Sequence, residues 1–282
     1  MRNNQDRFSP FQQAQQNFVS PIAQANQPVF NFVTPVELVD LPSGGKYYPQ
    51  NHPLCGKSVV EIKHMTAREE DILSNKSYIE KGIVLDKLLE SIMMDKNIDP
   101  QSILIIDKNA ILLKARITGY GEHYPSSVFC PTCASVVKVD FNLNDLAPIQ
   151  QAQPPQGAVV LENGFVAAPL PISKWKVVLK PLSGYDQELV SKAVEMRKKH
   201  NLEENILLET LKSFIYSVND ITDSLSIQTA IENMPARDSK YIRTIFPRCF
   251  PSITTSVKTK CENCKTETDS EVPFNSNFFW PE

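Results

Sequence analysis

The chain has 282 residues, which is enough for two domains of ordinary size that each bury a core. Hydrophobic residues make up 41% and charged residues 22%, as is typical of a folded globular protein. The formal charge of -3 gives no reason to expect nucleic acid or an anionic membrane as partner. The N-terminal sequence is polar and no apolar run could cross a bilayer, so we expect neither a signal peptide nor membrane insertion.

Residues 1–35 are rich in Gln, Asn, Pro and Phe and contain no Gly. Too little aliphatic surface is present for an independent core, which predicts an extended or disordered arm. Single aromatic residues recur along this polar segment, namely Phe8, Phe11, Phe18, Phe30 and Phe32. Such a pattern suits insertion into grooves of partner proteins, although a tail with incidental Phe residues remains the alternative.

Globular sequence begins at Val36, and residues 36–145 predict a first α+β segment. A strand is expected at Val59–Lys63 because its apolar residues alternate. Thr66 can cap the following helix, with Glu69 in the capping-box position three residues later. A longer helix is expected from about Lys81 to Met94, with its apolar residues on one face.

Asp107 is expected to cap a further helix. The sequence around the first pair of cysteines, Ser127–Phe141, reads as strand, tight knuckle and strand. A Pro- and Gln-rich linker follows at 146–157.

The same order of elements recurs after the linker, in residues 158–282. Val60–Thr66 aligns with Val177–Ser183, and a cysteine-containing hairpin again closes the series. Further matched positions are Glu69 with Asp186, Asp71 with Glu188, Leu85 with Leu207, Ser91 with Ser213, and Asp107 with Asp238. The sequence therefore predicts an α+β fold of two pseudo-symmetric repeats, each made of a strand, helices and a zinc-knuckle hairpin.

Two CxxC pairs are the strongest chemical signal: Cys130 with Cys133, and Cys261 with Cys264. In a chain without a secretion signal this pattern favours metal over disulfides. Four thiolates complete a tetrahedral site without an open position, so we expect one structural zinc ion in a ribbon-like site shared by both repeats. Iron–sulfur ligation, a redox dithiol and uncoordinated thiols are the alternatives.

No catalytic pattern is found. The four histidines are far apart and fit no metal or triad motif: His52, His64, His123 and His200. The acids Glu69, Glu70 and Asp71 stand where they favour the N-terminus of a helix. We therefore expect no enzymatic activity. The C-terminal segment Asn277–Glu282 carries three consecutive aromatics, which either pack back on their own domain or anchor a partner.

The chain resembles the baseplate hub proteins of T-even-type contractile-tailed bacteriophages. The resemblance spans residues 36–145, and in the second half it is carried by the CxxC pair. The motifs that carry it are Leu41–Pro49, Val60–Leu73, Asp95–Asp99, Arg116–Gly121 and Cys130–Cys133.

This resemblance implies a non-enzymatic structural component of the tail baseplate hub, needed for baseplate and tail assembly and built in the host cytoplasm. Its implied partners are other hub and wedge proteins, with a homo-oligomer also open, and without nucleic acid or a membrane. One alternative is a hub assembly factor that does not remain in the mature virion. A metal-dependent nucleic-acid-binding protein or enzyme is the other.

Overall fold

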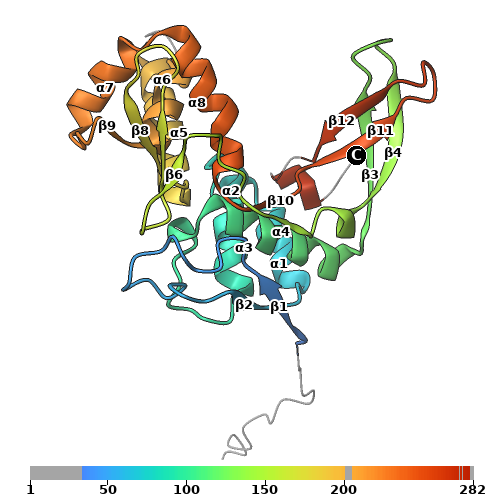
Figure 1. Ribbon diagram of the computed structural model, residues 1–282. Helices are drawn as coiled ribbons and strands as arrows, with labels where there is room; N and C mark the ends of the chain where they lie inside the picture. The colour runs from blue at the N-terminus through green and yellow to red at the C-terminus, as the bar shows by residue number, and fades with distance from the viewer. Residues whose placement is uncertain (1–33, 201–204, 273, 275, 280–282) are drawn as a thin grey trace, which may run out of the picture. The chain divides into compact units, whose positions relative to one another are not determined.

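The computed structural model describes residues 34–200, 205–272, 274 and 276–279. The expected arm at 1–35 lies outside the described residues except for its last two positions. Residues 35–282 belong to one compact unit, a mixed α/β structure with several small antiparallel sheets (Figure 1). None of the described helices is long and apolar enough to cross a membrane.

The first half contains four strands and four α-helices among its described residues. In chain order these are β1 Val36–Asp40, β2 Val59–Lys63, α1 Ala67–Leu73, α2 Lys76–Glu80, α3 Val84–Ile92, α4 Ile105–Tyr120, β3 His123–Phe129 and β4 Val136–Asn142. Strands β1 and β2 pair with each other, as do β3 and β4. Short 3₁₀ turns lie at Pro100–Ser102 and Leu143–Asp145.

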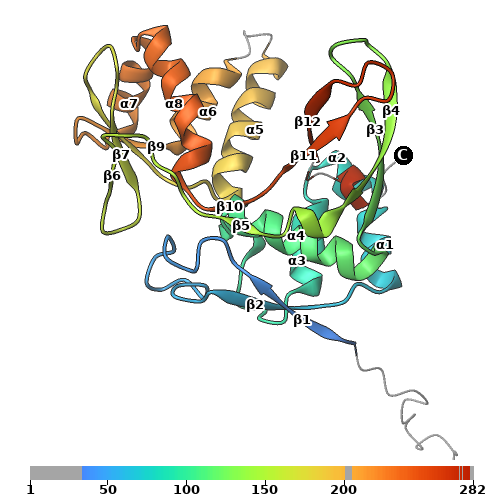
Figure 2. The same cartoon turned by 45° about the vertical axis from the view of Figure 1, so that its right-hand side comes forward.

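The second half continues with β5 to β12 and α5 to α8. Its elements are β5 Ile149–Gln150, β6 Val159–Val160, β7 Val166–Pro169, β8 Lys176–Leu179, α5 Gly184–Lys199, α6 Ile206–Phe214, β9 Ile215–Val218, α7 Ser224–Glu232, α8 Ala236–Cys249, β10 Ser252–Ile253, β11 Ser256–Lys260, β12 Glu267–Glu271 and a 3₁₀ turn at Ser276–Phe279. Strands β6 to β9 form one antiparallel sheet (Figure 2). The segment expected as a linker contains β5, which pairs with β10.

The long helix expected over Lys81–Met94 is shorter at both ends. Gly82 has a φ of 68°, a left-handed conformation that separates α2 from α3. At the other end Met93 forms a β-bridge with Ile62, and the Met94 N–H bonds to the Glu61 carbonyl oxygen. Pairing with β2 therefore stops the helix at Ile92, although the sequence pattern continues.

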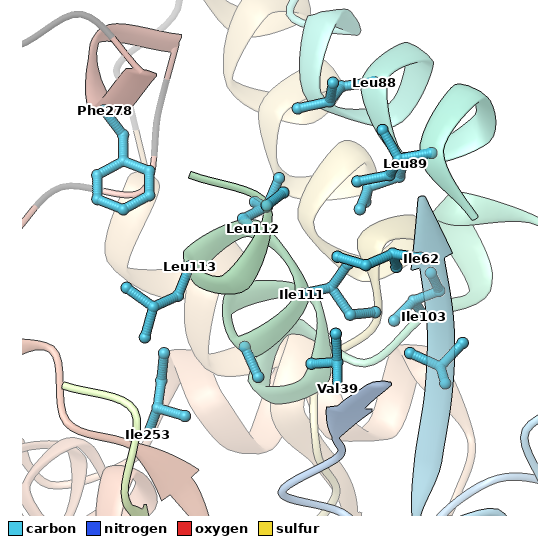
Figure 3. Close-up of a cluster of buried hydrophobic side chains, with 14 of the residues drawn as sticks. Val39, Ile62, Leu88, Leu89, Ile103, Ile111, Leu112, Leu113, Ile253 and Phe278 are labelled. Carbon is cyan, nitrogen blue, oxygen red and sulfur yellow. The ribbon is translucent and has the colours of Figure 1, made fainter. Parts of the chain in front are cut away.

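Two clusters of buried apolar side chains form the cores. The first surrounds α3 and α4, and Figure 3 shows Leu88, Ile111 and their neighbours within it. The second lies between the four-stranded sheet and α6, α7 and α8. The first cluster also contains residues from the far end of the chain: Ile253, Val272, Phe278 and Phe279. The C-terminal phenylalanines thus pack on the first half, although their sequence position lies in the second.

Capping boxes begin α1 and α5. The Thr66 N–H donates to the Glu69 carboxylate over 2.8 Å, which confirms the predicted cap. At α5 the Ser183 N–H donates to the Asp186 carboxylate over 2.9 Å. In each case a lysine three residues before the cap pairs with that carboxylate, Lys63 at 2.7 Å and Lys180 at 2.5 Å.

Asp107 does not cap a helix, contrary to the expectation from sequence. Helix α4 begins at Ile105, so Asp107 lies inside its first turn and is fully buried. Its carboxylate accepts bonds from the Ser43 N–H at 2.9 Å, the Ser43 hydroxyl at 2.6 Å and the Tyr48 hydroxyl at 2.7 Å. It therefore fastens the loop between β1 and β2 to the helix.

Asp238 has a corresponding role at the start of α8, where it fastens the turn between β7 and β8 to that helix. This carboxylate is also fully buried and accepts bonds from the N–H groups of Ile172 and Ser173, both at 2.8 Å. Burial raises the pKa of Asp107. At Asp238 burial is outweighed by these N–H donors, so its pKa is lowered.

Candidate metal centre

Each cysteine pair lies at the tip of a two-stranded hairpin. In the first hairpin Phe129 pairs with Val136, and residues 130–135 form the turn between them. The Cys130 N–H bonds to the Ser135 carbonyl oxygen and the Ala134 N–H to the Cys130 carbonyl oxygen, both over 2.9 Å. Ala134 has a φ of 55°, which closes the knuckle.

The second hairpin repeats this turn. Lys260 pairs with Glu267, and the Cys261 N–H bonds to the Thr266 carbonyl oxygen over 2.9 Å. The Lys265 N–H bonds to the Cys261 carbonyl oxygen over 2.9 Å, and Lys265 has a φ of 60°. Two turns with the same bonds thus present two pairs of thiols.

The two hairpin tips bring all four cysteines together, as the spacing predicts. Their Sγ atoms all lie within 4.8 Å of one another. Across the hairpins, Cys130 and Cys264 have their sulfurs 3.6 Å apart, as do Cys133 and Cys261. All four thiols are free, since a disulfide bond is about 2.0 Å long.

These distances fit a tetrahedral ion. With metal–sulfur bonds of about 2.3 Å, neighbouring sulfurs of a regular tetrahedron lie about 3.8 Å apart. The four cysteines are the one group of His, Cys, Asp or Glu side chains among the described residues that is arranged to hold an ion. They could therefore bind a metal, and four sulfur ligands would complete its coordination.

Two hydroxyl groups beside the cysteines were not singled out by sequence reasoning. The Ser135 hydroxyl lies 3.0 Å from the Cys133 sulfur, and the Thr266 hydroxyl lies 3.3 Å from the Cys264 sulfur. Each stands two residues after the second cysteine of its pair, a match that was visible in the sequence. Hydroxyls in these places can donate to thiolates and orient them.

The surroundings favour thiolates on the second hairpin. Backbone N–H bonding from Cys264 and a bond with the Ser135 hydroxyl lower the pKa of Cys261 to about 6. The Thr266 hydroxyl and backbone N–H lower the pKa of Cys264. Cys130 and Cys261 are buried while Cys133 is exposed, so one edge of the group faces solvent.

The histidines are not part of this group. His52 bonds to the Ser102 hydroxyl at 2.8 Å, His64 lies 3.4 Å from Glu37, and His123 lies 3.0 Å from Asp140. The side chain of Glu69 is taken up by the cap of α1 and by Lys63. Four residues considered from sequence as candidates for catalysis therefore have contacts outside the cysteine group: His52, His64, His123 and Glu69.

Comparison with known protein families gives a match over most of the chain. The family model described as "T4 bacteriophage base plate protein" matches residues 34–280, and thus includes both cysteine hairpins. No curated protein and no solved structure matches the chain. Because the match covers most of its length, the chain belongs to the T4 bacteriophage base plate protein family.

Proposed function

We propose that the protein is a non-enzymatic structural component of the tail baseplate hub that remains in the mature virion and is needed for baseplate and tail assembly. Membership of the base plate family supports a structural component of the phage baseplate. The observation that carries the finer proposal is the meeting of four cysteines from two hairpins 128 positions apart in the chain. Such a connection suits a rigid building block.

The four cysteines bind one structural zinc ion in this proposal. Cys130, Cys133, Cys261 and Cys264 would be its ligands, and no position would remain for a reactive water. Ser135 and Thr266 would orient two of the thiolates. The ion would hold both hairpins in place, and its binding free energy would add to the stability of the fold.

We also propose that the chain arose by duplication of one α+β unit. Support comes from features that recur in order: a lysine-bound capping box, a buried aspartate at a helix start and a cysteine knuckle. The repeats would span residues 36–145 and 158–282, with a linker at 146–157 and the arm at 1–35. A zinc ion between matching hairpins would then lie near the pseudo-twofold axis.

Other hub and wedge proteins are the proposed partners, and self-association of the chain is a further proposal. A second candidate function is a hub assembly factor that leaves before the virion matures. A metal-dependent nucleic-acid-binding protein or enzyme is the third, but the acids Glu262, Glu267, Asp269 and Glu271 on the second hairpin argue against a nucleic-acid surface.

The composition of purified particles tests the proposal. We expect stoichiometric amounts of the protein in mature tails and baseplates, and an arrest of baseplate assembly when its gene is disrupted. Absence from mature particles together with the same arrest would identify an assembly factor instead. Metal analysis of the purified protein should give one zinc per chain; an ion with exchangeable bound water would contradict the closed site.

A further inference from the structure

A basic hollow lies on the first half of the chain, away from the cysteines. It has a volume of about 670 Å³ and is bounded by α1, α2, α3 and the turn that follows α3. Four cationic side chains line it, namely Lys63, Arg68, Lys87 and Lys96, against one acidic side chain, Glu90.

Two of these cations lack a carboxylate partner. Lys63 pairs with Glu69 at 2.7 Å, and Lys87 pairs with Glu90 at 2.6 Å. Lys96 instead donates to backbone carbonyl oxygens at the end of α3, those of Glu90 at 2.7 Å and Ser91 at 3.0 Å. The guanidinium of Arg68 makes no ion pair or hydrogen bond with the described residues.

The charges around Lys96 affect the pKa of its ammonium group. Burial lowers the pKa of the Lys96 ammonium and the charge of Lys63 lowers it further, while Glu90 and Glu69 raise it and Arg68 lowers it again. An anion placed between Arg68 and Lys96 would relieve this repulsion.

Part of the lining of the hollow is apolar. Ile72, Met93 and Met94 line it, and Met94 is 47% exposed. Methionine adapts its shape to many partners and is common on surfaces that bind varied peptides. A ligand that fits this hollow therefore combines negative charge with an apolar side chain.

On the proposed duplication, three of these four cations have no cationic counterpart in the second half. By the matched positions, Arg68 corresponds to Tyr185, Lys87 to Glu209 and Lys96 to Val218. Lys63 alone has a cationic counterpart, Lys180, and both lysines pair with a capping carboxylate. That one lysine thus has the same contact in both halves, whereas the other three are particular to the first half.

We propose that this hollow binds an acidic segment of a partner protein, with its carboxylates on Arg68 and Lys96 and an adjacent apolar side chain on Met94. A peptide fits better than a nucleic acid, because Glu90 would repel a run of phosphates and the apolar part of the lining would remain unused. Arg68 suits this role, since its planar group can hold a carboxylate by two parallel bonds.

Binding of short peptides to the full chain tests the proposal. The probe is a fluorescent peptide in which Asp and Glu flank two leucines, compared with a copy that carries Gln and Asn in their place. We expect saturable binding of the acidic peptide, which weakens as salt rises. Arg68→Gln should weaken it about tenfold, while Arg243→Gln, a change at an exposed arginine of α8, should leave it unchanged.

Further variants separate binding from folding. Met94→Ser should weaken the leucine peptide but not a peptide with serine in place of leucine, and thermal unfolding should show that Arg68→Gln is as stable as the parent protein. Equal binding of the acidic and neutral peptides would overturn the proposal. So would undiminished binding by Arg68→Gln, or stronger competition from inorganic phosphate or duplex DNA than from the unlabelled peptide.

Discussion

The sulfur atoms of Cys133 and Cys261 lie 3.6 Å apart, although 128 positions separate them in the chain. Each belongs to a knuckle built by its own hairpin, with the same two backbone bonds. Local bonds therefore hold each turn, whereas the meeting of the two turns depends on the rest of the fold. A bond through a common ion would close a very long loop, which restricts the unfolded chain more than a local clip does.

Loss of the cysteine group should destabilise the whole protein. Replacing Cys130 and Cys133 with Ser should remove the metal and lower the free energy of unfolding by at least about 3 kcal/mol, because structural zinc binds with about 10–16 kcal/mol. Metal analysis and thermal unfolding measure the two effects. Cys55→Ala, a change outside the group, should keep the metal. Retention of a full equivalent of metal by the double variant would contradict the shared site.

Acid should destabilise the protein partly through Glu69. Burial alone would raise the pKa of this carboxyl, but bonds from Lys63, Ser91 and Thr66 lower it to about 2. Its ordinary value is about 4.3, so its stabilisation is complete above that pH and is lost as the pH falls towards 2.

The variant Glu69→Gln isolates this contribution. It should cost about 3 kcal/mol at neutral pH, and the difference from the parent protein should shrink between about pH 4.5 and pH 2. Denaturant titrations at several pH values measure both quantities. Glu80→Gln, at an exposed position on α2, is the matched control and should change little. A cost that does not vary with pH would rule out this account.

The hydroxyl of Tyr48 should stabilise the loop that Asp107 holds. It donates to the Asp107 carboxylate over 2.7 Å and accepts the Leu104 N–H over 3.1 Å. Tyr48→Phe leaves both buried groups short of a partner and should cost about 1–3 kcal/mol. Tyr216→Phe, at a tyrosine that is 45% exposed, should be nearly neutral in the same unfolding experiment. Equal effects of the two substitutions would show that the buried bonds contribute nothing.

Removing the ring of Phe278 should weaken the first core. Phe278 is fully buried beside Tyr124, with ring centroids 5.4 Å apart. Phe278→Ala should cost about 3–5 kcal/mol, as is usual for a buried phenylalanine. Val160→Ala, at an exposed position of β6, should change stability by less than about 0.5 kcal/mol. A cost below about 1 kcal/mol for Phe278→Ala would contradict the packing.

Local signals in the sequence were sufficient for several elements. The cap at Thr66 was predictable because a capping box involves residues only three positions apart. The knuckles were predictable because two cysteines with two residues between them favour one turn. The meeting of the four cysteines was also expected, because the sequence predicts a repeated order of elements with the two hairpins at matching points.

Features set by distant contacts were not predictable. The end of α3 depends on Met93 pairing with Ile62, which no local pattern reveals. Asp107 resembles a helix cap in sequence, but its partners Ser43 and Tyr48 lie about sixty positions earlier. The packing of the C-terminal aromatics likewise depends on distant contacts, because Phe278 lies in the first core.

The burial of Phe278 and Phe279 in the first core has a consequence for the order of folding during synthesis. Translation delivers the N-terminal half first, and domains generally fold as they emerge from the ribosome. Here two side chains that complete the earlier half, Phe278 and Phe279, are made only after the intervening second half. Until then the first half has an incomplete core, so we expect a chain that stops before Phe278 to fold incompletely.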